Sequence, residues 1–316
     1  MNLLSNRKIL PYLALLAGLL ALTISPLFAA WSTASGPVFA FYRMVTGAVI
    51  LLPFFLRDRA ADDLPVLRWY IIFPILGGLA EALDLSTWAT AIHYTSLATG
   101  TLLNNTAPIW VALTAWLVFK EKLGGLFWVG LALAVAGAGI VLSSDFIYNP
   151  SLNLGNLLGA VSGLFYGLYY LITQHGRRYL SAIRYTYIMT LSTGVFTLLF
   201  SLVLGYRLTG FPLSTYLASI GAGVVAQSAG FLALAYALGQ LSASTVSPSM
   251  LLQPVFSALL AIPLLHQPLK PSQWVGGLAV LGGIYLLNRS LNKPPAAREP
   301  GGGLSSVFVE QDPPDS

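Results

Sequence analysis

Three formally charged residues, Arg43, Glu81 and Asp84, lie within apolar stretches that are long enough to cross a membrane. A charge at bilayer depth costs at least ~2.5–3.5 kcal/mol, so each of these side chains needs a partner or a polar cavity. Glu81, Asp84 and Trp88 are spaced so that they share one face of a helix. This pattern is typical of a site that binds a polar solute or carries a proton.

All three charges and one amide are expected at the same level of the membrane. With a helical rise of ~1.5 Å per residue, Glu81 and Asp84 lie about 18 Å and 22 Å from the cytoplasmic end of their helix. Arg43 lies about 20 Å from the inner boundary of a ~30 Å core, and Asn104 reaches the same layer from outside. We predict a polar site of Glu81, Asp84 and Asn104, with Trp88 as an aromatic wall and Arg43 balancing the carboxylates.

A purely structural alternative is a buried ion pair between Arg43 and one carboxylate, which would only orient the second and third helices. Two carboxylates against one guanidinium leave one acid over, and this excess is hard to explain by helix orientation alone. Because removal from water disfavours the charged form of a carboxyl group, the surplus acid is a candidate proton carrier.

Further side chains are candidates for the lining of the same cavity: Trp110, Tyr166, Tyr169, Tyr170 and Gln227. For each aromatic residue, helix packing or contact with lipid is the competing interpretation. The chain has no cysteine, and its three histidines are far apart, so no metal site and no cofactor are expected.

The elements that position these residues are membrane-spanning helices. The chain has 316 residues, of which 56% are hydrophobic and only 9% are charged, with a mean hydropathy of +0.75. Soluble domains carry roughly 25% charged residues. Ten stretches have about the 20 apolar residues that one crossing requires: 9–30, 37–56, 69–91, 96–119, 124–143, 154–174, 185–206, 213–238, 243–265 and 272–288. We interpret the first as an uncleaved helix, because a second span follows within a few residues.

Basic residues predict the orientation, since Lys and Arg favour cytoplasmic loops. With the N-terminus inside and ten crossings, thirteen of the 16 basic residues lie in cytoplasmic segments, and only Arg207 and Lys270 lie in outer loops. We expect an integral protein of the bacterial-type inner or plasma membrane, with both termini cytoplasmic. We therefore attribute the net charge of +5 to basic residues of cytoplasmic segments, which orient the chain in the lipid bilayer. No nucleic-acid partner is expected.

The chain also contains an internal repeat. Residues 89–140 and 235–286 align without a gap at an offset of 146, with identities that include Ala89/Ala235, Ser96/Ser242, Thr99/Thr245, Pro108/Pro254, Ala112/Ala258, Leu113/Leu259, Ala115/Ala261, Leu123/Leu269, Trp128/Trp274, Val129/Val275, Gly130/Gly276 and Gly137/Gly283. Because five spans are an odd number, the second copy is expected to be inverted. The predicted fold is an all-α polytopic membrane protein with ten transmembrane helices in two inverted five-helix repeats.

The expected organisation is a first repeat at 1–144, an outer linker at 145–153, a second repeat at 154–291 and a disordered cytoplasmic tail at 292–316. Pro108 and Pro254 occupy matching positions, where they bend the helix and act either as hinges or as static kinks. The matching glycine pairs, seven residues apart in both copies, indicate close helix packing.

Several motifs resemble those of the EamA-type transporters of the drug/metabolite transporter superfamily, over nearly all of residues 9–290. They are Tyr42-Arg43-Met44, Asp84 with Trp88, Ala91 to Ser96, Pro108-Ile109-Trp110 and Phe119 to Leu123. The resemblance implies transport, often export, of small metabolites, amino acids or drugs through a cavity between inverted halves. The second repeat departs from the pattern, with His266-Gln267-Pro268-Leu269 where an acidic residue usually precedes the leucine. We therefore assign Glu121, its counterpart in the first repeat, to structure at the membrane interface.

We expect a secondary transporter, and an exporter in direction, that moves a small organic solute by alternating access, with proton coupling as one option. No GxxxxGK[ST] loop is present to bind ATP. A carrier of nucleotide sugars or lipid intermediates is an alternative, but it would need several basic residues in the cavity. An intramembrane enzyme is a second alternative. This chain, however, lacks the additional acids or histidines that a catalytic metal site would need beside Glu81 and Asp84. Because both repeats lie in one chain, a monomer would contain both sides of the cavity, and a functional monomer is expected.

Overall fold

The computed structural model describes residues 3–58, 69–95, 97–142, 154–265 and 271–291. Within these ranges the regular structure is entirely helical. The predicted linker at 145–153 and the tail at 292–316 lie outside the described residues. The helices are α1 (Leu3–Thr23), α2 (Ser25–Ala30), α3 (Gly36–Arg57), η2 (Trp69–Ile71), α4 (Ile72–Tyr94), α5 (Leu97–Asn104), α6 (Ala107–Leu117), α7 (Gly125–Leu142), α8 (Leu154–Gly176), α9 (Ala182–Val203), α10 (Leu213–Ala222), η3 (Gly223–Phe231), α11 (Leu232–Leu238), α12 (Ala243–Ser249), α13 (Leu252–Leu265) and α14 (Pro271–Leu291).

Six segments of the described chain are long and apolar enough to cross a membrane: Ile9–Ala30, Gly36–Arg57, Trp69–Tyr94, Leu154–Gly176, Ala182–Val203 and Leu213–Leu238. They coincide with the predicted spans one to three and six to eight. The other four predicted spans correspond to α5 with α6, to α7, to α12 with α13, and to α14. The number of ten crossings therefore stays a prediction.

The fourth and ninth predicted spans are each folded as two short helices rather than one bent helix. Pro108 lies in the first turn of α6, and Pro254 lies in the first turn of α13. Proline is well tolerated there, because an N–H in the first turn has no partner within the helix. At both positions the α-helical hydrogen bonding gives way to a tight turn, with Thr106 N–H bonded to Leu103 O in one span and Leu251 N–H bonded to Pro248 O in the other.

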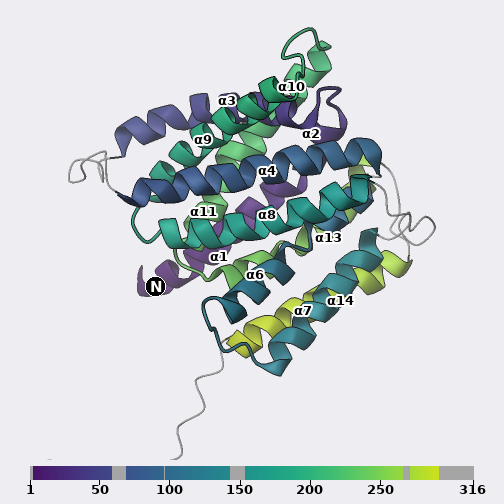
Figure 1. Cartoon of the computed structure of the whole chain (residues 1–316). Helices are drawn as coiled ribbons and strands as arrows, with labels where there is room; N and C mark the ends of the chain where they lie inside the picture. The colour runs from purple at the N-terminus through teal and green to yellow at the C-terminus, as the bar shows by residue number, and fades with distance from the viewer. Residues whose placement is uncertain (1–2, 59–68, 96, 143–153, 266–270, 292–316) are drawn as a thin grey trace, which may run out of the picture.

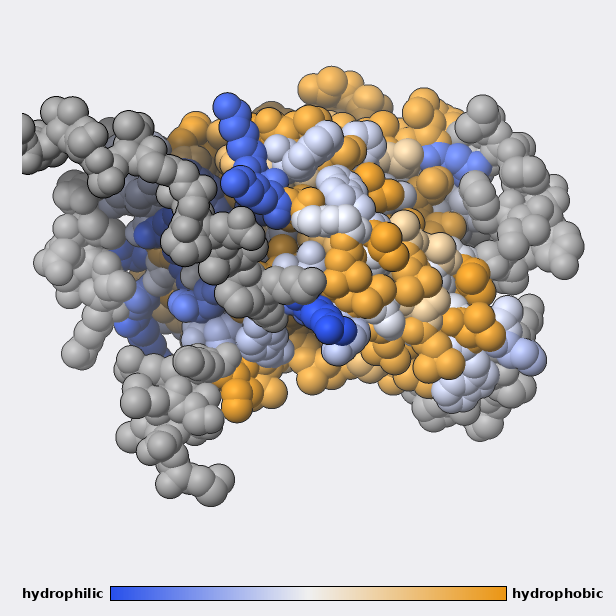
Figure 2. Space-filling view, turned by 90° about the horizontal axis from the view of Figure 1, so that it is seen from below, coloured by the Kyte–Doolittle hydropathy of each residue, from blue (hydrophilic) through white to orange (hydrophobic). Residues whose placement is uncertain are grey.

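The helices are packed as a bundle in which α4 has a central place. Figure 1 shows α4 between α3 and α9 on one side and α8 on the other, and α4 contacts both α8 and α9 extensively. Hydrophobic residues cover most of the middle of the face in Figure 2, and hydrophilic residues gather toward its left end. An apolar outer surface with polar ends is the distribution that a lipid bilayer requires.

Helices α7 and α14 form a close pair at the lower right of Figure 1. A Cβ added to Gly137 would lie 2.6 Å from the carbonyl oxygen of Gly276, and one added to Gly130 would lie 2.8 Å from that of Gly283. Backbones can approach this closely only where a side chain is missing. The prediction that the repeated glycines pack helices together is confirmed.

One span contains a wider helical segment. Residues 223–231 form a π-helix between α10 and α11, and this segment carries the buried Gln227 and Phe231. A π-helical turn within an otherwise α-helical span is uncommon and often lies at a functional site. Both side chains are brought to the neighbourhood of Arg43 and Glu81, as described below.

Candidate functional site

Arg43 lies in α3 and is only 1% exposed. Its Nη1 donates to Ser25 Oγ at 3.2 Å, and its Cζ lies 5.3 Å from the ring centroid of Phe231. Within the described residues no carboxylate lies within 4.0 Å of this guanidinium, and its Nε and Nη2 have no hydrogen-bond partner. The ion pair with Glu81 or Asp84 that a purely structural role would require is not formed.

Asp84 is held by a neutral donor. Asn104 Nδ2 donates to Asp84 Oδ1 at 2.7 Å and also to Ser162 Oγ at 3.1 Å. Ser162 in turn donates to the carbonyl oxygen of Gly159 at 2.7 Å. The contact joins α4, α5 and α8 at the level where the sequence places Asp84 and Asn104.

Glu81 faces a different helix. Thr193 Oγ1 in α9 lies 3.0 Å from Glu81 Oε2, while Glu81 Oε1 has no partner in the described part of the chain. Gln227 lies next to Glu81, and its Nε2 donates to Thr190 Oγ1 at 3.0 Å. The two carboxylates of α4 are therefore solvated separately by neutral polar side chains.

The threonines of α9 were not among the residues singled out from the sequence. Buried hydroxyl residues recur along one side of this helix, and all are fully buried: Thr186, Thr190, Thr193, Thr197 and Ser201. Their spacing of three or four residues is the signal that identifies one face of a helix. A polar stripe on an apolar span indicates a face turned toward the protein interior.

A cavity of about 50 Å³ lies between these helices, with room for roughly three or four water-sized groups. Arg43 and Asp84 are its charged lining residues, and Asn104 and Gln253 are its amide residues. Its lining comprises Leu22, Ser25, Pro26, Arg43, Asp84, Leu85, Trp88, Thr101, Asn104, Tyr166, Phe231 and Gln253. Larger grooves of about 680 and 360 Å³ are almost wholly apolar. The smaller cavity, with charged and amide side chains in its wall, is the better candidate for recognising a solute.

The structure thus brings five of the predicted site residues to the cavity wall: Arg43, Asp84, Trp88, Asn104 and Tyr166. Four others, Glu81, Tyr169, Tyr170 and Gln227, are buried but outside the lining. Tyr169 forms ring contacts with Tyr166 and Phe231 at 6.0 and 5.4 Å between centroids. It therefore supports two residues of the wall from behind.

Trp110 lies away from this cavity. Its side chain is 37% exposed, and its Cβ faces α8 near Gly167. A partly exposed tryptophan on an apolar helix is typical of contact with lipid. No group of three potential metal ligands occurs in the described residues.

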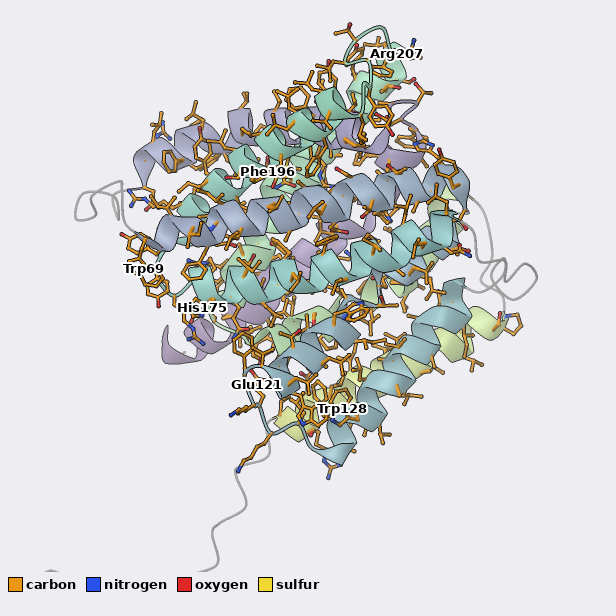
Figure 3. The ribbon with its side chains drawn as sticks, in the orientation of Figure 1. Trp69, Glu121, Trp128, His175, Phe196 and Arg207 are labelled. Carbon is orange, nitrogen blue, oxygen red and sulfur yellow. The ribbon has the colours of Figure 1, made fainter. Side chains whose placement is uncertain are left out.

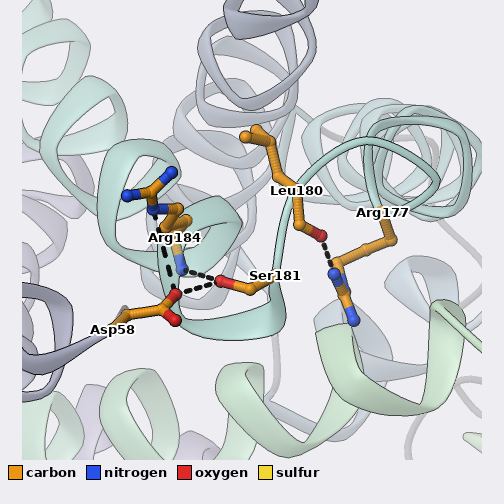
Figure 4. A network of polar contacts seen from close by, with 5 residues as sticks. All are labelled: Asp58, Arg177, Leu180, Ser181 and Arg184. Atoms are coloured by element: carbon orange, nitrogen blue, oxygen red, sulfur yellow. Dashed lines mark hydrogen bonds and ion pairs between the residues drawn. The ribbon is translucent and has the colours of Figure 1, made fainter. Parts of the chain in front are cut away.

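One end of the bundle carries a network of polar contacts between segments that are distant in sequence. Asp58 accepts a hydrogen bond from Ser181 Oγ and lies 3.9 Å from Arg184 Nε (Figure 4). Arg177 Nε donates to the carbonyl oxygen of Ala235 at 2.9 Å and its Nη1 to that of Leu180. This network fixes the ends of α3, α8, α9 and α11 to one another.

Glu121 adds a contact at the same end. Ser244 Oγ donates to Glu121 Oε2 at 3.1 Å, which joins the loop after α6 to α12. Figure 3 shows Glu121, Trp69 and His175 at one end of the bundle and Arg207 at the other. Glu121 therefore lies at an end of the helices and outside the cavity lining.

Comparisons with known proteins identify related sequences and structures. The sequence model of the EamA-like transporter family matches this chain twice, at residues 9–143 and 153–289. The chain is 32% identical over 254 residues to the uncharacterized protein PA1977 of Pseudomonas aeruginosa, covering 79% of this chain and 83% of that protein. It is 25% identical over 265 residues to the uncharacterized transporter YwfM of Bacillus subtilis, covering 82% and 86%. A solved protein crystal structure superimposes with a TM-score of 0.72 at 16% identity, covering 92% of this chain and 99% of that one. At that identity, the likeness concerns the fold.

Proposed function

This chain belongs to the EamA-like transporter family and is an integral membrane transporter, and we propose that it moves a small organic solute by alternating access. The solute would bind in the cavity beside Arg43, Asp84 and Asn104, with Trp88 and Tyr166 as aromatic walls. The direction we propose is export across the inner or plasma membrane.

One observation carries this proposal: a cavity with buried charged side chains in its wall lies between the two parts of the chain that match the family. Its lining takes Arg43, Asp84 and Asn104 from the first match, and Tyr166, Phe231 and Gln253 from the second. Polar groups at this depth are costly and are kept where they serve a pathway. A site between two repeats is accessible from either side when the repeats rock against each other.

The topology that we propose has ten crossings in two inverted repeats, 1–144 and 154–291, with both termini in the cytoplasm. The odd number of spans in each repeat and the distribution of basic residues support it. The separation of Glu121 and Arg207 to opposite ends of the bundle is consistent with it. A single chain would contain the whole pathway and work as a monomer.

Movement is proposed at the two interrupted helices. The breaks before Pro108 and Pro254 occupy matching positions in the two repeats, and both prolines are buried. Helix breaks in a membrane are tolerated where the freed backbone groups are buried in protein or line a cavity. We propose that the short helices on either side of each break change their angle when the cavity opens.

Transport by the purified full-length chain in liposomes tests this function. Vesicles with the protein are expected to release a labelled solute from a panel of amino acids, organic acids, amines and nucleosides, chemically unchanged. Asp84→Asn is expected to slow release strongly, whereas Arg207→Gln, outside the cavity, is expected to leave it unchanged. A chemically altered product would indicate an enzyme, single-channel conductance would indicate a channel, and either would contradict the proposal.

A further inference from the structure

The cavity wall contains more hydrogen-bond donors than the protein itself satisfies. Arg43 Nε and Nη2 and Trp88 Nε1 are buried donors that have no acceptor in the described part of the chain, and both residues line the cavity. Thr101 Oγ1, also in the lining, is likewise unpartnered. Buried donors are nearly always paired, so this group of them calls for a ligand that supplies acceptors.

The free part of Arg43 has a specific shape. Its Nη1 is already bonded to Ser25, and its Cζ lies over the ring of Phe231. The remaining edge carries the Nε and Nη2 donors, which are adjacent and point in parallel. Two parallel N–H groups match the two oxygens of one carboxylate, which is the geometry of a bidentate pair.

The protein's own acids do not occupy this edge. Asp84 is bonded by Asn104, and Glu81 is contacted by Thr193, so neutral donors take the place that the guanidinium would otherwise fill. The two acids nevertheless make the surroundings unfavourable for a ligand with more than one negative charge. A singly charged carboxylate fits these conditions better than a phosphate dianion.

We propose that the transported solute carries a carboxylate group. Its two oxygens form a bidentate pair with Nε and Nη2 of Arg43, and the Trp88 N–H is a third donor. This inference rests on the proposed function and adds the chemical class of the solute. A volume of about 50 Å³ holds the three heavy atoms of a carboxylate and roughly one more. The rest of the solute would enter only when the cavity widens.

Binding to the purified full-length chain tests the proposal with matched pairs of probes. Thermal stability is measured against concentration for propionate and propionamide, phenylacetate and phenylacetamide, and L-leucine and L-leucinamide. At least one acid is expected to stabilise the protein, with its amide at least tenfold weaker. Arg43→Gln is expected to lower the affinity for that acid about 10- to 100-fold, since a charge-assisted pair is lost.

Two further variants keep the test informative if Arg43→Gln does not fold. Arg43→Lys keeps the charge without the planar edge, and an intermediate affinity is expected. Trp88→Phe removes only the N–H, and a smaller loss is expected. Arg207→Gln is the control, because this exposed arginine lies outside the cavity, and its affinity for the acid should equal that of the wild type.

Several results would overturn the inference. They are equal binding of an acid and its amide, an unchanged preference for the acid in Arg43→Gln, or transport of a solute without a carboxylate while no acid binds. In the last case the protein would still be a transporter. Failure of the whole panel both to bind and to be transported would instead count against the proposed function itself.

Discussion

The contact between α7 and α14 allows a sharp test of the packing, because two glycines of α7 differ only in what they face. A Cβ on Gly137 would lie 2.6 Å from Gly276 O and 2.7 Å from Val280 N, both backbone atoms that cannot move aside. The shorter distance is about 0.8 Å less than the 3.4 Å at which ordinary contact begins. A Cβ on Gly139 would meet nothing within 4 Å.

Gly137→Ala is therefore expected to push the two helices apart and to destabilise the protein by about 1–3 kcal/mol. Gly139→Ala should instead gain up to roughly 1 kcal/mol, since alanine is the better helix former. In thermal melts of the purified protein in detergent, we expect Gly137→Ala to melt about 2–6 °C below the wild type. Gly139→Ala should melt at or above it. Equal melting temperatures for the two variants would refute the claim that the backbones touch at Gly137.

Three further predictions concern the site and the end of the bundle. If a carboxyl of α4 carries the proton, Glu81→Gln or Asp84→Asn should remove the pH dependence of transport in liposomes, and an unchanged pH profile in both variants would reject proton coupling there. Asn104→Ala leaves a buried acceptor unpaired, which should cost about 1–3 kcal/mol in stability and abolish the thermal shift produced by the solute; a retained shift would move the site elsewhere. Ser244→Ala removes the hydrogen bond to Glu121. The loop after α6 should then separate from α12 more often, which exposes this end of the bundle to solvent. Since the chain has no cysteine, faster labelling of a single cysteine introduced there would report the change, and an unaltered rate would contradict it.

The level of each polar residue along its helix could be predicted from the sequence. Helical rise alone placed Asp84 and Asn104 in one layer, and the structure brings their side chains to 2.7 Å. Rise is a property of the backbone and hardly depends on neighbouring helices. The close approach of Gly137 to Gly276 was predictable for a similar reason, because small residues at matching positions mark where backbones meet.

The partners of the charges could not be predicted in the same way. Glu81 is contacted by Thr193 rather than by Arg43, because which helix faces a side chain depends on rotation and on the order of the bundle. Nor does the sequence distinguish a bend from a break at Pro108, since the same residue is compatible with both. The hydroxyl stripe of α9 was the signal that would have indicated the second neighbour of α4.

The π-helical segment at 223–231 has a consequence for how the chain tolerates change in length. A π-helical turn contains an additional residue for the same advance along the helix axis, so the segment can lose one residue without becoming shorter. A deletion within Gly223–Phe231 could be absorbed by conversion to α-helix, leaving α10 and α11 in register with their neighbours. The same deletion would turn Gln227 and Phe231 relative to Arg43. Related chains could thereby acquire a different cavity wall without rebuilding the bundle.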